Sequence, residues 1–373
     1  MIPVCTPVIT EADTAAVSKA VSEGWVSADG PYVEAFEEAW AAECQRDHGI
    51  AVANGTAALQ LAIAALELPP GSEIIIPSFT IMSCALAAVY NNLIPVFVDC
   101  HADTWTMNED AVAEAITEKT RAIMIVHMYG HPCDMDPLLA LAKKHSLKII
   151  EDAAQTHGAQ YRGQICGSFG DVSCFSFYAN KIITTGEGGM VVTDNPRYAE
   201  KIRQLRNLSH SPKQRFYHEE LGYNYRMTSM QAALGTSQCQ RLKQFVDTKR
   251  DIAARYTEAF SDIASLQLPI EKSWAKSVFW MYGIVLNAST GLDAAAVIKQ
   301  LRDRGIGARS FFIGLHQQPA LINKLGTFTG DFSVTEKISQ QGLYLPSGLN
   351  LLDGDDIQQV IKVVRQIFEV AHA

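Results

Sequence analysis

The sequence predicts an α/β protein: a mostly parallel, seven-stranded sheet with helices on both faces, followed by a smaller C-terminal α+β domain. Short apolar runs alternate with helical stretches along the first part of the chain, which is typical of α/β folds. The runs are rich in Ile and Val, as expected for strands buried on both faces. The pattern then changes, and 373 residues suffice for two domains with ample cores. We therefore expect a large domain at residues 1–239 and a small one at residues 240–373.

The chain is expected to open with two helices joined by a loop. Residues 11–22 and 31–45 have helical patterns, and the second is amphipathic. Between them, Trp25, Val26 and Ser27 come before a Gly-Pro turn, which predicts a loop.

The first strand, at residues 50–53, leads into a helix that can bind a phosphate. The sequence NGTAA at residues 54–58 opens a helix rich in Ala and Leu that extends to about Leu68. Its first turn presents free backbone N–H groups and the positive end of the helix dipole, and the Thr56 hydroxyl adds a donor. An ordinary capped helix has the same pattern. The dinucleotide-binding fingerprint is excluded, because no GxGxxG follows the first strand.

The other six strands of the sheet are predicted from apolar runs in the middle of the chain. These runs are residues 73–77, 95–99, 122–127, 147–151, 172–177 and 189–193. Helical stretches lie between most of them, at residues 80–91, 108–117 and 134–146.

Two of these strands end near chemically active side chains. The run 147–151 leads to Asp152, and the run 172–177 leads to Lys181 and a cluster of glycines. In an open α/β sheet, functional groups collect beyond the carboxyl ends of the strands, so both side chains are expected in one crevice. They suit pyridoxal 5'-phosphate (PLP), with the lysine forming a Schiff base and the acid holding the pyridinium nitrogen. A solvated lysine and a helix-capping acid are the alternatives, but the apolar neighbours of Lys181 disfavour the first.

Two further segments allow more than one interpretation. His127, His131 and Cys133 could bind a metal, but the Gly and Pro between them predict a loop, so a structural or cofactor-lining loop is favoured and no metal site is predicted. Residues 197–220 are polar and basic, which fits a mobile loop over an anionic ligand or, more simply, a solvated connector.

The C-terminal part is predicted to begin after a long helix at residues 222–242. Its elements are helices at 249–260, 293–304 and 354–371 and strand-like runs at 278–286 and 306–312.

Composition limits the classes of partner and compartment. The net charge of −9 argues against nucleic acid or an anionic membrane as the main partner. The eight cysteines form no CxxC pair, so buried free thiols are expected. The N-terminus does not look like a signal peptide, and no apolar run approaches the roughly 20 residues that span a bilayer. We therefore expect a cytoplasmic protein.

With these residues in place, the chain resembles the PLP-dependent nucleotide-sugar aminotransferases of the aspartate-aminotransferase fold, known as PLP fold type I. The resemblance covers essentially the full length. It rests on nine motifs in order: GWVSADGPYVEAFE, NGTAALQLA, IIPSFT, PVFVD, VHMYGHPCDMD, IEDAAQTHGA, FGDVSCFSFYANKIITTGEGGMV, GYNYRMTSMQAALG and RSFFIGLHQQP. One motif alone would be weak, but nine in order make a chance resemblance very unlikely.

The resemblance assigns roles by position. Lys181 matches the Schiff-base lysine, Asp152 the acid at the pyridinium nitrogen, and Gln155 a residue near the ring hydroxyl. The positions that match phosphate ligands are Thr56, Ala57 and Ser176. Asn224 matches an asparagine that reaches the phosphate from the neighbouring subunit, which implies a homodimer, or a dimer of dimers, with shared active sites. Candidate contacts to the sugar nucleotide are Ser27, Arg309, Phe312 and His316.

Two positions depart from the family pattern. Many relatives have an aromatic residue after the PSFT motif to stack on the cofactor ring, where this chain has Ile81, so His157 is a candidate for that contact. The family's RPFFYP element appears as RSFFIG at residues 309–314, which puts substrate contacts there in question.

Within the family, the resemblance favours amination of C4 of GDP-4-keto-6-deoxy-D-mannose with L-glutamate as donor. A UDP- or dTDP-linked keto sugar is the alternative substrate. A PLP-dependent sugar dehydratase typically has histidine at the lysine position, so Lys181 disfavours it. A non-catalytic PLP-binding regulator is a third alternative, and the missing glycine fingerprint disfavours a nicotinamide dehydrogenase.

Overall fold

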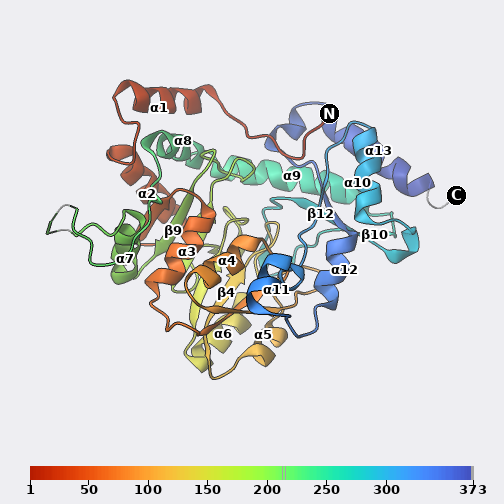
Figure 1. Ribbon diagram of the computed structural model, residues 1–373. Helices are drawn as coiled ribbons and strands as arrows, with labels where there is room; N and C mark the ends of the chain where they lie inside the picture. The colour runs from red at the N-terminus through yellow and green to blue at the C-terminus, as the bar shows by residue number, and fades with distance from the viewer. Residues whose placement is uncertain (212, 215, 371–373) are drawn as a thin grey trace.

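The central sheet has the strand number and directions that the sequence predicts. The computed structural model describes residues 1–211, 213–214 and 216–370. Seven strands form the sheet in the order β1-β9-β8-β5-β4-β2-β3 (Figure 1). Neighbouring strands from β8 to β3 are parallel, and β9 alone runs against its two neighbours. The bounds are β1 His48–Val52, β2 Glu73–Pro77, β3 Ile94–Val98, β4 Thr120–Val126, β5 Lys148–Asp152, β8 Val172–Ser176 and β9 Gly189–Thr193.

Helices bury both faces of this sheet, because successive side chains of its strands point to opposite faces and are apolar on both. Ile74 and Ile76 face the core under α3 (Gly55–Ala65) and α4 (Met82–Tyr90). Ile75, between them, faces the core under α5 (Glu109–Ala115) and α6 (Met135–His145). The helices predicted at 80–91, 108–117 and 134–146 are therefore confirmed with slightly tighter ends. Helices α1 (Glu11–Ser22) and α2 (Pro31–Glu43) pack on α8 (Ser229–Cys239).

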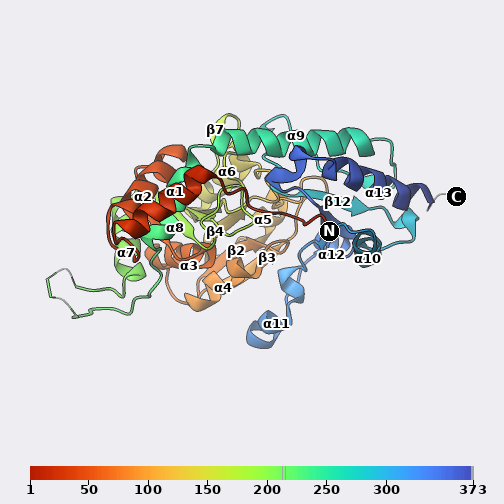
Figure 2. The same cartoon turned by 90° about the horizontal axis from the view of Figure 1, so that it is seen from above.

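A second, antiparallel sheet organises the C-terminal part. Its order is β10-β12-β14-β13, with bounds Leu266–Gln267, Tyr282–Leu286, Gly342–Leu345 and Arg309–Ser310. The helices here are α9 (Leu242–Phe260), α10 (Ala294–Asp303), α12 (Ser333–Gln341) and α13 (Asp356–Val370). Two halves can be distinguished, one built on the large sheet and one on the second sheet. Helix α9 lies along both halves, whereas α11 (Pro319–Leu325) projects from the body (Figure 2). The remaining strands form a three-stranded sheet in the order β11-β6-β7, with bounds Ala275–Lys276, Gln160–Tyr161 and Gln164–Ile165.

The N-terminal segment packs against the C-terminal part of the molecule. Ile2 forms a parallel bridge with Ile306, and the Ser347 N–H donates to the Val4 carbonyl at 2.9 Å. The chain then crosses to α1 (Figure 1). The first residues thus belong to the C-terminal core, although the domain boundary predicted near residue 240 remains a prediction.

Several predicted elements are wrong in detail. Residues 197–206, predicted as a connector, belong to helix α7 (Pro196–Arg206), which buries Ala199, Ile202 and Leu205 under a polar surface. The predicted helix at 222–242 begins only at Ser229, where Thr228 caps it, and α9 starts separately at Leu242. The runs 278–286 and 306–312 contain only short strands. Helices α11 and α12 and strand β14 were not predicted. The last residue of the helix predicted at 354–371 lies outside the described residues. No described helix is both long and apolar enough to cross a membrane.

Candidate active site

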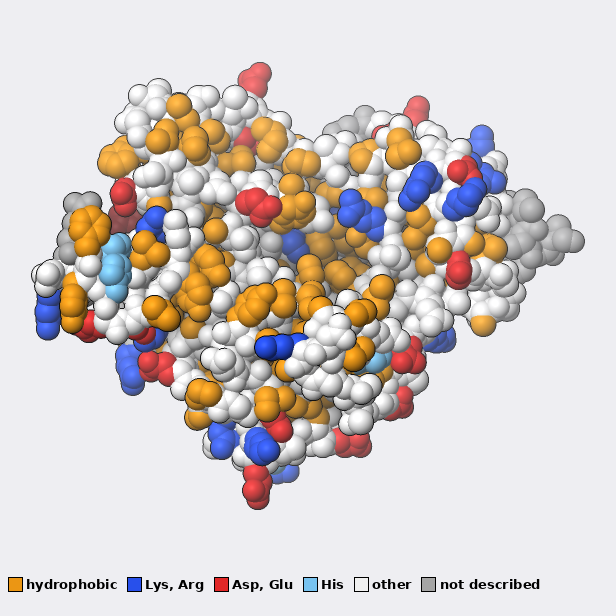
Figure 3. All heavy atoms as spheres, in the orientation of Figure 1, with side chains coloured by type: hydrophobic (Ala, Val, Ile, Leu, Met, Phe, Trp, Pro, Cys, Tyr) orange, Lys and Arg blue, Asp and Glu red, His pale blue; other side chains and the backbone are white. Residues whose placement is uncertain are grey.

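A cavity of about 610 Å³ opens beyond the carboxyl ends of β5 and β8. Its lining includes Asp152 at the end of β5, Lys181 from the turn after β8, and Thr56 from the first turn of α3. Arg309 and Tyr344 line it from the second sheet. The space-filling view shows a hollow between the two halves with hydrophobic side chains around it (Figure 3). The predicted crevice is therefore present, and it lies between the two sheets.

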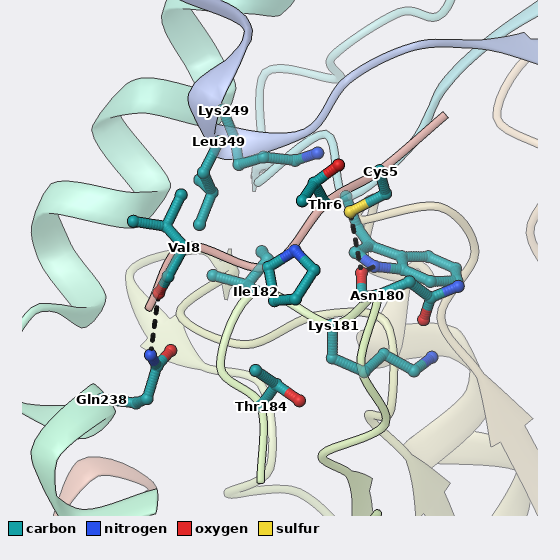
Figure 4. A pocket seen from close by; sticks show the side chains of 12 residues that line it. Cys5, Thr6, Val8, Asn180, Lys181, Ile182, Thr184, Gln238, Lys249 and Leu349 are labelled. Carbon is teal, nitrogen blue, oxygen red and sulfur yellow. Dashed lines mark hydrogen bonds between the residues drawn. The ribbon is translucent and has the colours of Figure 1, made fainter. Parts of the chain in front are cut away.

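Lys181 reaches this cavity from a tightly bonded turn after β8. Its N–H donates to the Tyr178 carbonyl at 2.8 Å. The carbonyl of Asn180, just before it, accepts a hydrogen bond from Trp280 Nε1 at 2.7 Å and one from Cys5 Sγ at 3.7 Å (Figure 4). Burial lowers the pKa of Lys181 to about 8, although the charge of Asp152 raises it in part. An amine with such a pKa is partly neutral near physiological pH.

Asp152 is held at both of its oxygens. Oδ1 accepts the Ala154 N–H at 3.0 Å, and Oδ2 accepts the Cys84 thiol at 3.3 Å. Burial raises the pKa of this carboxyl, while these two donors and the charge of Lys181 act in the opposite direction. Because Asp152 and Lys181 line one cavity and affect each other's pKa, they form the amine–acid pair that the sequence predicts.

Hydroxyl groups gather at the start of α3. Asn54 caps this helix by accepting the Ala57 N–H at 2.9 Å, and Thr56 Oγ1 lies 2.7 Å from Ser83 Oγ. Ser176 lines the same end of the cavity. A side chain at Gly55 would meet Ser176 at 2.8 Å, so a glycine is required for β8 to approach the helix this closely. The predicted Thr56 and Ser176 are thus together, whereas the Ala57 N–H is engaged by the cap.

Other predicted residues lie outside the lining of this cavity. Gln155 is buried beside it, with Oε1 accepting the Tyr129 N–H at 2.6 Å. His316 Nδ1 lies 2.6 Å from Ser78 Oγ, and its ring stacks on Phe332. The carbonyl of Ser27 accepts the Ser229 N–H at 2.6 Å. Asn224 pairs with Asn207 in an isolated antiparallel bridge. Of the predicted substrate residues, Arg309 and Phe312 line the cavity and His316 and Ser27 do not.

His157 does not take the place of a stacking aromatic residue. Its ring packs against Trp40, Phe175 and Phe177 and does not line the cavity. Burial lowers its pKa to about 3. Ile81, at the position where relatives have an aromatic residue, does line the cavity.

The structure adds aromatic residues that the sequence patterns did not identify. Trp280, Tyr178, Tyr225 and Tyr344 all line the cavity. Trp280 lies in an apolar run that predicts a strand, so nothing local marks it as part of a site. Only the approach of the second sheet to the first brings it to Lys181.

The histidines of the loop after β4 are part of a hydrogen-bonded network. His127 Nε2 lies 2.9 Å from Glu151 Oε1, and His127 Nδ1 accepts the Cys133 N–H at 3.0 Å. His131 Nε2 accepts the Lys272 N–H at 3.2 Å. His127, Glu151 and Cys166 form a buried group close enough to hold a metal, but both ring nitrogens of His127 already have partners. The group therefore ties β4, β5 and the following turn together.

The chain is similar to known proteins along nearly its full length. The profile of the DegT/DnrJ/EryC1/StrS aminotransferase family matches residues 7–365. A GDP-perosamine synthase of Caulobacter vibrioides is 38% identical over 344 residues, covering 92% of each chain. The GDP-perosamine synthase of Escherichia coli O157:H7 is 35% identical over 368 residues, covering 99% of this chain and 98% of the relative. The solved PLP form of Spr1654 from Streptococcus pneumoniae has a TM-score of 0.91 at 26% identity and covers 99% of each chain.

Proposed function

The chain belongs to the DegT/DnrJ/EryC1/StrS aminotransferase family, and we propose that it moves an amino group from L-glutamate to the C4 keto group of GDP-4-keto-6-deoxy-D-mannose to give GDP-perosamine. The observation that carries the proposal is that the Lys181 amine and the Asp152 carboxylate line one cavity with the hydroxyl-rich start of α3. The GDP-perosamine synthases among the relatives support this choice of substrate. The product would serve deoxy-amino-sugar biosynthesis of the O-antigen type in lipopolysaccharide.

The residues around the cavity fit PLP. The phosphate would lie at the first turn of α3, where Thr56, Ser83 and Ser176 bring three hydroxyls together and the helix dipole favours an anion. Asp152 would receive the ring N–H, and Lys181 would hold the aldehyde carbon. Gln155 would lie near the ring hydroxyl. Hydroxyl donors would thus face the phosphate, a carboxylate acceptor the ring N–H, and an amine the aldehyde.

Lys181 is the proposed acid and base of the reaction. When bound, PLP supplies an electron sink for the electrons left as the α-proton of the amino acid departs. Lys181 then takes that proton at Nζ and later returns it, which its lowered pKa of about 8 favours near neutral pH. Asp152 would stay ionised by pairing with the ring N–H. The Trp280 ring covers the amine on one side, so water is partly excluded from the proton transfer.

The substrates would enter between the two halves. Arg309 is exposed at the lining, next to Tyr344 across the β13–β14 pair, and its guanidinium can pair with a carboxylate or a phosphate. Phe312 adds an apolar surface. L-Glutamate and the sugar nucleotide both carry the anionic groups that this pattern suits.

A homodimer, or a dimer of dimers, with shared active sites completes the proposal. Asn224 lies on the segment just before α8, and it would reach the phosphate of the partner's cofactor. We place the protein in the cytoplasm, which agrees with its eight free cysteines, all within the described residues. The proposal involves neither nucleic acid nor a membrane as partner.

A panel of keto-sugar nucleotides tests the proposed function. Purified protein with L-glutamate is offered the GDP-, UDP- and dTDP-linked 4-keto and 3-keto sugars, and products are identified by mass and by NMR. We expect turnover of the GDP 4-keto sugar, and no turnover by Lys181→Ala, which also loses the visible band of lysine-bound PLP. Preference for a UDP- or dTDP-linked sugar would reject the substrate and leave the aminotransferase intact. Full activity of Lys181→Ala would reject the mechanism.

A further inference from the structure

The thiol of Cys84 lies against the Asp152 carboxylate. Cys84 belongs to the first turn of α4 and is fully buried. Its Sγ lies 3.3 Å from Asp152 Oδ2 and 3.6 Å from Thr80 Oγ1. Thr80, Cys84 and Asp152 therefore form a chain of polar contacts that ends on the acid at the carboxyl end of β5.

The chemistry of the site makes Cys84 the donor in this contact. Burial raises the pKa of its thiol well above the ordinary value, and the charge of Asp152 raises it further. The sulfur therefore keeps its proton, and an ionised carboxylate can only accept. The other oxygen of Asp152 accepts the Ala154 N–H at 3.0 Å. Two donors from different elements thus fix the plane of the carboxylate.

We propose that Cys84 is a positioning residue, whose thiol holds the Asp152 carboxylate in the orientation that receives the ring N–H of the cofactor. This inference rests on the proposed function, because it concerns the acid that would face the pyridine ring. A carboxylate offers about four lone-pair sites, so two donors leave room for a third. A thiol is also a weak donor, so it orients Asp152 while leaving the carboxylate more basic than a hydroxyl would.

The first turn of α4 supports both ends of the cavity in this arrangement. Cys84 contacts the acid, and its neighbour Ser83 contacts the Thr56 hydroxyl at 2.7 Å. One helical turn therefore sets the position of the acid relative to the hydroxyl-rich end. The distance between the acid and these hydroxyls decides whether a rigid ring with a phosphate on one side can contact Asp152 and the hydroxyls at once.

The test compares cofactor binding among variants of residue 84. Cys84→Ala and Cys84→Val both remove the donor, and Val keeps more of the volume, whereas Cys84→Ser keeps a donor. Cys44→Ala is the matched control, because it removes another buried thiol, one that lies at the C-terminal end of α2 rather than against Asp152. The full-length chain, freed of cofactor, is titrated with pyridoxamine phosphate across a range of pH. This probe needs no bond to Lys181.

We expect Cys84→Ala and Cys84→Val to bind the probe about fivefold more weakly, the effect of losing one hydrogen bond. Binding should also be lost at a higher pH on acidification, because a donor to the charged carboxylate is gone. Cys84→Ser should keep the affinity and, because a hydroxyl is the stronger donor, should lose binding at the wild-type pH or below it. Cys44→Ala should change neither property.

The two possible failures are distinguishable. If the wild type binds the probe and the Ala and Val variants match it in affinity and pH dependence, Cys84 does not position Asp152, and the proposed function stands. If the wild type binds neither pyridoxamine phosphate nor PLP, the proposed function fails, and this inference fails with it.

Discussion

The Nζ atom of Lys181 lies 3.9 Å from the centre of the Trp280 ring, a separation suited to a cation–π interaction. The ring itself is fixed, because its Nε1–H donates to the Asn180 carbonyl at 2.7 Å and only 6% of the residue is exposed. The aromatic face therefore stabilises the charged form of the amine that is proposed to carry the proton.

Replacing Trp280 by leucine is expected to lower the pKa of Lys181 below its value of about 8. A cation–π interaction worth about 0.7 kcal/mol corresponds to about half a pKa unit. Because the neutral amine is the base, the acidic limb of the pH–rate profile should move to lower pH. Single-turnover rates of α-proton removal from L-glutamate measure this limb. Trp280→Phe is the control: it keeps an aromatic face over the amine, so the acidic limb should stay close to its wild-type pH. An acidic limb that does not move in Trp280→Leu would contradict the cation–π interaction.

Replacing Asp152 by asparagine is expected to slow proton removal by several orders of magnitude. The amide cannot supply the negative charge that stabilises a positive ring nitrogen. Its size is nearly unchanged, so the fold should survive. Stopped-flow measurement of the L-glutamate half-reaction checks the rate, and thermal unfolding checks the fold. A near-normal rate would remove Asp152 from its proposed role.

Lys249 should make stability depend on pH. This amine is buried next to the N-terminal segment and donates to the carbonyl and hydroxyl of Ser347. Burial lowers its pKa from 10.5 to about 8. The unfolded chain then binds more protons between about pH 8 and 10.5, so its contribution makes stability rise with pH in that window.

The variant Lys249→Met tests this contribution. It should weaken the pH dependence between pH 8 and 10.5, and near pH 7 it removes a penalty of at most about 3 kcal/mol. The lost hydrogen bonds to Ser347 reduce that gain. Urea unfolding of the cofactor-free chain at several pH values measures both effects. Lys243→Met, which removes an exposed lysine, is the control. Identical pH slopes for wild type and Lys249→Met would rule out the lowered pKa.

Replacing Glu151 by glutamine is expected to destabilise the protein by about 3 kcal/mol, because a buried acceptor network is broken. Its oxygens accept from the Gly167 N–H at 2.6 Å, the Phe169 N–H at 2.9 Å and Ser173 Oγ at 2.7 Å, besides the contact with His127. A glutamine NH₂ would face one or more of these donors. Chemical denaturation measures the loss, and Ser173→Ala, which removes a single donor, should cost about 1 kcal/mol. Equal stability of wild type and Glu151→Gln would contradict this interpretation of the network.

Mixing two inactive variants tests whether the sites are shared between subunits. Lys181→Ala removes the amine, and Asn224→Asp places a negative charge where the partner's phosphate is proposed. In a mixed dimer, one site then contains both intact residues. Random exchange of subunits should restore about a quarter of wild-type activity. Each variant alone, taken through the same exchange, is the control. No recovery despite demonstrated mixing would assign Asn224 to its own chain.

The strands and the amine–acid pair could be predicted because their signals are local. A buried parallel strand appears in the sequence as a short run of Ile and Val. Functional side chains lie at or beyond its carboxyl end, as Asp152 does at the last position of β5 and Lys181 does after β8. The helix start at residues 54–58 is also a local pattern, confirmed by the Asn54 cap.

The rest of the site depends on contacts between distant residues. Cys84 meets Asp152 across 68 positions of sequence, and Trp280 meets Asn180 across 100. No periodicity or motif encodes such pairs. Helix α7 was missed for a different reason: three small or medium apolar residues on one face are outnumbered by the charged residues of its exposed face.

The carbonyl of Asn180 receives one donor from the second half of the molecule, Trp280, and one from the N-terminal segment, Cys5. The small cavity beside this carbonyl also has Lys181 and Lys249 in its wall. The peptide group that precedes Lys181 is therefore clamped from two sides, so an alteration in the first residues of the chain could be felt at the amine without any change in the cavity lining.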